Sequence, residues 1–64
     1  MNNREMMLKQ IEATLKQEKD YLKVLDKKLN DPNVTGSARE KVLIFREACI
    51  NAIDRHEKAR LQYV

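Results

Sequence analysis

The apolar residues in the first half of the chain recur with a heptad spacing. One line of the repeat consists of leucines at every seventh position, and the other consists of two aliphatic residues with a glutamate between them. The complete seam is Leu8, Ile11, Leu15, Glu18, Leu22, Leu25 and Leu29. On an α-helix these positions share one face, which is typical of a helix that packs along a neighbour. The pattern therefore predicts a helix over about residues 3–30.

The second half of the chain has a wider apolar face. Its regular seam consists of Ala38, Val42, Phe45, Cys49, Ala52, His56, Ala59 and Tyr63. Four large aliphatic residues lie off this seam, namely Leu43, Ile44, Ile50 and Ile53. A stripe this wide is typical of a helix with two or more neighbours. We therefore expect a helix over about residues 37–62, with these four residues forming a partner-binding face.

Signals for a turn lie between the two segments. The only proline, Pro32, should end the first helix, because proline disfavours the helical conformation at the residue before it. The only glycine, Gly36, supplies backbone freedom. The spacing of Ser37 and Glu40 matches a capping box, which predicts that the second helix starts near Ala38. At the other end, Asn2 or Asn3 is expected to cap the first helix, with Glu5 near its third position.

These elements predict an all-α, antiparallel two-helix hairpin in which residues 1–64 form a single domain. A loop of about six residues is within the usual range for neighbouring helices in bundles. A single core below about 70–80 residues rarely supplies more than ~3–5 kcal/mol of stability. We therefore expect two hairpins to associate as a homodimer in a four-helix bundle. A different protein that covers the same face is the other possibility.

Composition narrows the class of protein further. Charged residues make up 36% of the chain, and the longest apolar run, from Val42 to Phe45, is far shorter than the roughly 18 residues of a spanning helix. The first ten residues lack the apolar segment of a secretory signal, and the single cysteine cannot form an intramolecular disulfide. We expect no membrane partner and a cytoplasmic location. Abundant Lys, Asn and Gln suit a small bacterial or phage protein.

The sequence contains no catalytic constellation, cofactor motif or metal-ligand cluster, so we predict a protein that is not an enzyme and has no cofactor. His56 is the only histidine, and a metal site normally needs three or four ligands, so a partly buried structural residue is the favoured interpretation. Cys49 lies among apolar neighbours, which favours an inert, buried thiol over a reactive one.

Glu18 is the polar interruption of the first seam. Antiparallel pairing about the loop places it opposite Cys49, with Arg46 one helical turn away. A carboxylate in a core is costly unless it is paired, so one hypothesis pairs Glu18 with Arg46, within the hairpin or across a dimer, and thereby sets the register. The other hypothesis lets the helix rotate slightly so that Glu18 reaches water and the Lys19 stem covers the gap.

Lysines form a stripe along the first helix, at Lys9, Lys16, Lys19, Lys23 and Lys27. A face that contacts nucleic-acid phosphates is one interpretation. Acidic residues lie among these lysines, the net charge is only +3, and no aromatic stacking platform accompanies them. The leading hypothesis is therefore a protein–protein interaction module, such as an adaptor, an inhibitor or an assembly factor. An RNA- or DNA-binding regulator is the alternative.

Overall fold

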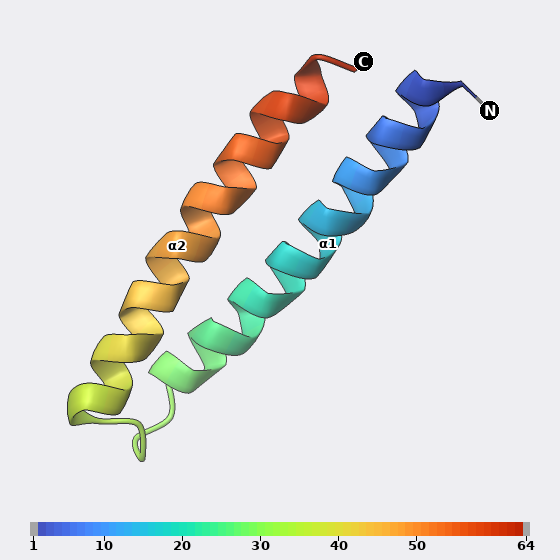
Figure 1. The fold of residues 1–64 in the computed structure, drawn as a ribbon. Helices are drawn as coiled ribbons and strands as arrows, with labels where there is room; N and C mark the ends of the chain where they lie inside the picture. The colour runs from blue at the N-terminus through green and yellow to red at the C-terminus, as the bar shows by residue number, and fades with distance from the viewer. Residues whose placement is uncertain (1, 64) are drawn as a thin grey trace.

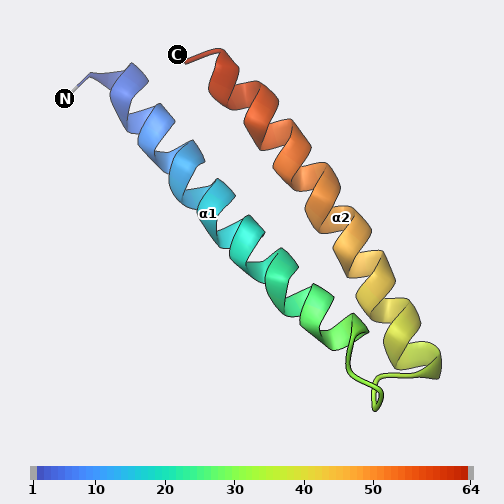
Figure 2. The ribbon, with the colours of Figure 1, turned by 180° about the vertical axis from the view of Figure 1, so that it is seen from behind.

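Two long helices that pack side by side make up the computed structural model, which describes residues 2–63. Helix α1 spans Asn3–Leu29 and helix α2 spans Gly36–Leu61. The helices are antiparallel, with the loop at one end and both termini at the other (Figures 1 and 2). Within the described residues there is no strand, and neither helix is long and apolar enough to cross a bilayer. The predicted all-α hairpin is confirmed.

The start of α1 follows the sequence prediction. Asn2 is the N-cap, and its side-chain oxygen accepts a hydrogen bond of 2.8 Å from the backbone N–H of Glu5. This bond satisfies one of the four N–H groups that have no partner within the helix. At the other end, Lys27 and Lys28 lie in the last turn, where positive charge is favourable.

The loop is a tight turn built around Pro32. The backbone N–H of Val34 donates to the Asp31 carbonyl at 3.1 Å, and the Asp31 carboxylate accepts from the N–H of Asn33 at 2.9 Å. Gly36 then adopts φ +57°, in the left-handed region that favours glycine.

The predicted capping box is wrong. The N-cap of α2 is Thr35, which makes no side-chain cap hydrogen bond, and Ser37 lies inside the first turn. Because α2 begins at Gly36 and its N-cap is Thr35, the Ser37 side chain is not at the capping position.

The core forms between the two seams. Leu25 is only 2% exposed and clusters with Val42 and Cys49, and further packing comes from half-buried residues on both sides. Ile11 and Leu15 continue the buried stripe toward the termini. All seven positions of the predicted first seam are buried or half-buried, so the heptad pattern of α1 is confirmed.

Helix α2 is rotated relative to its predicted seam. Val42 and Cys49 are buried as expected, but Phe45 is 51% exposed and Ala38 is also exposed. The other four seam positions, Ala52, His56, Ala59 and Tyr63, are half-buried, and so are Arg46, Ile53 and Arg60, which lie one position further along. This small rotation packs Ile53 beside the smaller Ala52, and the two arginines can lay their stems along the core and keep their charges near water.

Candidate functional site at the edges of the hairpin

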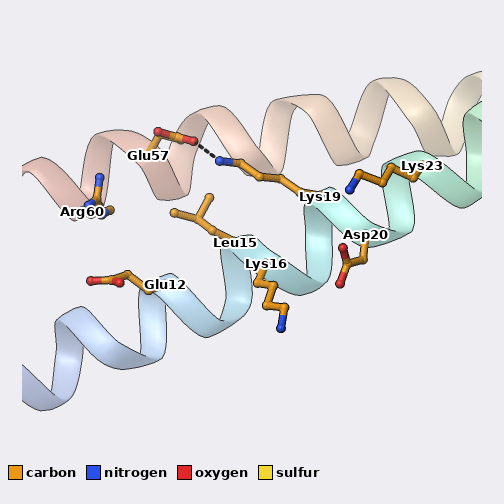
Figure 3. A pocket seen from close by; sticks show the side chains of 8 residues that line it. All are labelled: Glu12, Leu15, Lys16, Lys19, Asp20, Lys23, Glu57 and Arg60. Atoms are coloured by element: carbon orange, nitrogen blue, oxygen red, sulfur yellow. Dashed lines mark ion pairs between the residues drawn. The ribbon is translucent and has the colours of Figure 1, made fainter.

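Ion pairs close one edge of the hairpin. Arg46 Nε lies 2.7 Å from Asp26 Oδ1, and Lys19 Nζ lies 2.9 Å from Glu57 Oε1. We call this side the salt-bridged edge, and Figure 3 shows the second of its two pairs. All four side chains are partly exposed, so each pair adds little to stability but covers the seam between the helices on this side.

The salt-bridged edge contains a groove of about 470 Å³. Its lining has four cationic and three anionic side chains around Leu15, namely Lys16, Lys19, Lys23, Arg60, Glu12, Asp20 and Glu57. Leu15 lies between the two helices, whereas Lys16 and Asp20 point away from α2 (Figure 3). The mixture of signs gives no consistent field for an anion or a cation.

The five lysines of the nucleic-acid hypothesis are all exposed, but the structure does not gather them into one site. Lys16, Lys19 and Lys23 line the groove, and Lys19 is engaged by Glu57. Lys9 and Lys27 lie on the same helix outside the groove. Among residues 2–63, Lys19 alone of these five makes a salt bridge.

Three of the four predicted partner-binding residues are on the surface. Leu43 and Ile50 are both partly exposed, at 44% and 39%, and Ile44 is 65% exposed. The prediction for Ile53 is wrong, because this residue packs against Leu25, Val42 and Cys49 in the hairpin's own core. The same rotation of α2 that turns Phe45 outward turns Ile53 inward.

The opposite side of the hairpin has an apolar edge that sequence reasoning missed. On α1, Tyr21 and Val24 lie across the seam from Asp26 by helical spacing, and on α2 Phe45 and Ala48 lie across it from Arg46. Because Asp26 and Arg46 face each other on the salt-bridged edge, these four residues border the other side. We call it the aromatic edge.

The residues of the aromatic edge lie at about the same height along the long axis of the hairpin. The contacts of Cys49 with Glu18 and of Arg46 with Asp26 place residues 18–26 alongside residues 46–49. Tyr21, Val24 and Phe45 are each about half exposed there. The only signal for this edge in the sequence was Phe45 itself, which the regular seam had assigned to the core.

A polar cluster joins the helices at the centre of the interface. His56 Nδ1 lies 2.8 Å from Glu18 Oε1, and the Cys49 thiol donates to the Glu18 carbonyl at 3.2 Å. The predicted position of Glu18 opposite Cys49 is confirmed. The predicted pairing of Glu18 with Arg46 within the hairpin is wrong, because Glu18 pairs with His56 and Arg46 reaches Asp26 one heptad further along. Arg46 lies on the salt-bridged edge, away from the side that Glu18 faces.

This cluster is poorly suited to nucleophilic chemistry. Burial, together with the negative charge of Glu18, raises the pKa of the Cys49 thiol above its ordinary value of 9.0. A nucleophilic cysteine requires the opposite shift, toward thiolate. Within residues 2–63, no group of three or more His, Cys, Asp and Glu side chains is placed to hold a metal ion. The contacts of the cluster therefore support alignment of the two helices.

No family model, curated protein or solved structure matches this chain.

Proposed function

We propose that this chain is a non-enzymatic protein–protein interaction module that works as a homodimer, with two hairpins forming a four-helix bundle through their aromatic edges. The observation that carries the proposal is the exposure of Tyr21, Val24 and Phe45 at the same height along the edge opposite the Arg46–Asp26 and Lys19–Glu57 ion pairs. Exposed apolar residues gathered in this way are typical of interaction sites.

The hairpin exposes more surface than a compact monomer of the same mass. The hairpin exposes 5091 Å², whereas compact monomers of 7.6 kDa expose about 4,300 Å². The difference of about 800 Å² follows from the elongated shape, and it is of the order of the area that one partner contributes to a standard interface. A second hairpin is an occupant of suitable length, because the molecule is an elongated body of 48 × 15 × 12 Å.

The arrangement of the two copies follows from the positions of the apolar residues. A two-fold axis parallel to the helices places α1 of each hairpin on α2 of the other, so that all neighbouring helices are antiparallel. Tyr21 and Val24 then lie against Phe45 of the partner subunit, because these residues are level within one chain. By helical spacing Lys28 lies one heptad from Tyr21, and Lys41 and Arg55 lie one heptad to either side of Ala48, so these three exposed cations stand at the ends of the apolar contact, where charged side chains can remain in water.

This role suits an adaptor, an inhibitor or an assembly factor in the cytoplasm of a bacterium or of a phage-infected cell. The buried free thiol of Cys49 is compatible with such a reducing compartment. The abundant Lys, Asn and Gln of the chain suit such an origin.

Sedimentation equilibrium tests the dimer. At micromolar concentration the chain should have twice its mass of 7.6 kDa. Tyr21→Asp should shift the distribution toward the monomer, because it places a charge in the apolar contact. Lys16→Asp on the other edge is the matched control and should leave the dimer intact. A monomer at all concentrations up to about 1 mM would contradict the proposal.

The alternative is a nucleic-acid regulator that uses the lysine stripe. One observation favours it: Lys9, Lys16, Lys23 and Lys27 make no salt bridge within residues 2–63. Against it, Glu12, Asp20 and Glu57 lie beside the lysines of the groove. A gel shift at ~150 mM salt distinguishes the two roles. A sub-micromolar complex that the joint change of Lys9, Lys16 and Lys23 to Gln abolishes would favour the alternative.

A further inference from the structure

We propose that the outer flank of α2 binds a basic amphipathic helix of another protein. This inference rests on the interaction role proposed above, but it uses a surface that the dimer leaves free. The surface, which we call the acidic flank, combines three exposed aliphatic residues with a row of carboxylates. Its residues are Leu43, Ile44, Ile50, Glu40, Glu47 and Asp54.

The apolar residues of the acidic flank lie on two lines of the helix surface. Leu43 and Ile50 are seven residues apart, so they lie on one line of the helix surface. Ile44 lies on a separate line, on the side opposite the core, and is the most exposed of the three. An aliphatic strip two turns long matches the way in which helical ligands dock, with anchors at positions i, i+3 or i+4, and i+7.

The carboxylates run between these aliphatic lines. Glu40, Glu47 and Asp54 follow one another at sevenfold spacing and are all exposed. Their heptad line lies between the Leu43–Ile50 line and the line of Ile44. One of the three, Asp54, is 3.0 Å from Lys58 in the same helix, a highly exposed pair that a stronger partner can replace at little cost.

The charge pattern selects the partner. A helix that buries its aliphatic residues against Leu43 and Ile50 brings its flanking side chains beside this carboxylate row, where lysine and arginine are attracted and glutamate is repelled. The row spans 14 residues, or about 21 Å of helix. The complementary ligand therefore carries Lys or Arg at roughly sevenfold spacing beside an aliphatic seam.

A second copy of the chain fits this flank less well. Its own lysine stripe has the same sevenfold spacing, at Lys9, Lys16 and Lys23, but Glu12 and Asp20 lie beside it. The seam residues of α1 are already used in the hairpin core, and among its exposed apolar residues Tyr21 and Val24 belong to the aromatic edge, which leaves Met6 and Met7 near the start of the helix.

The experiment is a selection from a library of displayed helical peptides. The peptides have a fixed aliphatic seam, and their flanking positions are randomised among Lys, Glu, Gln and Ala. The bait is the full chain at ~150 mM salt. We expect the selected peptides to be enriched in Lys at the flanks. We expect Ile50→Asp and Glu47→Lys each to weaken the best peptide at least tenfold in Kd.

Two controls separate this inference from the proposed dimer. Phe45→Asp should dissociate the dimer but change the Kd of the selected peptide less than twofold, because Phe45 lies on the other edge. Glu47→Lys should leave the dimer intact, and selection against that variant should no longer favour Lys. Circular dichroism confirms that each exposed-residue variant is still helical.

Several results would overturn the inference. They are selection of acidic or uncharged flanks, recovery of no helical binder, and binding that is indifferent to Ile50→Asp. A fourth is association of the chain itself into tetramers that Ile50→Asp abolishes, which would assign the flank to a second copy. Loss of the dimer with retained peptide binding would leave the inference standing and remove only the proposed homodimer.

Discussion

Helices α1 and α2 have almost the same length, but they distribute their large apolar side chains differently. In α1 most of them lie in one seam that faces α2, whereas in α2 they occur on both flanks and on the outer side as well. A helix with one stripe needs one neighbour, and a helix that is apolar round much of its circumference needs several. The seam of α1 therefore serves mainly to complete the hairpin, whereas α2 completes it and also leaves large apolar side chains exposed on other sides.

The largest effect should come from the seam of α1. Leu25→Ala removes the most deeply buried side chain and should cost about 2–5 kcal/mol of unfolding free energy, enough to unfold much of a small hairpin. Ile44→Ala, on the outer side of α2, should change the same quantity by less than about 0.5 kcal/mol. Urea unfolding followed by circular dichroism measures both. Equal losses would show that Ile44 is not free in the isolated protein.

The rotation of α2 can be tested with a pair of substitutions. Ile53→Ala should destabilise the protein by about 1–2 kcal/mol at every protein concentration, because Ile53 is half-buried within its own chain. Phe45→Ala should have an effect that grows with concentration, because Phe45 lies in the proposed contact between copies. Thermal unfolding across a hundredfold range of concentration distinguishes the two patterns. The reverse result would restore the seam predicted from the sequence.

The two helices also start differently, and this gives a smaller effect. Asn2→Ala should cost about 1 kcal/mol, because it removes the side-chain acceptor of the Glu5 N–H. Thr35→Ala should cost much less, since the Thr35 side chain makes no capping bond. Hydrogen exchange of the first-turn amides in each helix provides the local measurement. A loss at Thr35 as large as that at Asn2 would contradict the described start of α2.

The smallest predicted effect concerns the Cys49 thiol at alkaline pH. Folding raises the pKa of this group above 9.0, so the protonated thiol favours the folded state. Its contribution to stability is complete below the pKa of the unfolded chain and is lost as the pH rises through the folded value. Cys49→Ala should therefore reduce the fall in unfolding free energy above about pH 9. Identical pH profiles for the two proteins would contradict the raised pKa.

These contrasts show how much the sequence could predict. The fold, the seam of α1 and the end of α1 at the turn could be predicted because each depends on local spacing or on proline and asparagine chemistry. The rotation of α2 could not, because two lines one residue apart both offer apolar residues. One line contains Phe45 and Ala52, and the next contains Arg46 and Ile53. Which of them faces α1 more directly depends on tertiary contacts such as the ion pair between Arg46 and Asp26.

The same ambiguity affected the candidate sites. The partner-binding set was predicted from residues off the regular seam, so Ile53 was included and Phe45 was left out. One of the two hypotheses for Glu18 paired it with Arg46, because both were placed near the core. The observed partner, His56, lies two helical turns beyond Cys49, and its side chain reaches back to Glu18. Side-chain reach of this kind is not evident from heptad positions alone.

The measurement that tests the central claim most directly is the mass in solution of two variants that differ only in which flank of α2 is changed. We predict by sedimentation equilibrium that Ile50→Asp remains a dimer and that Phe45→Asp is a monomer of 7.6 kDa. We also predict that about 1 M salt leaves the wild-type dimer intact, because its contact is apolar and only surface charges are screened. A dimer that survives Phe45→Asp but dissociates with Ile50→Asp, or one that dissociates in high salt, would contradict the account.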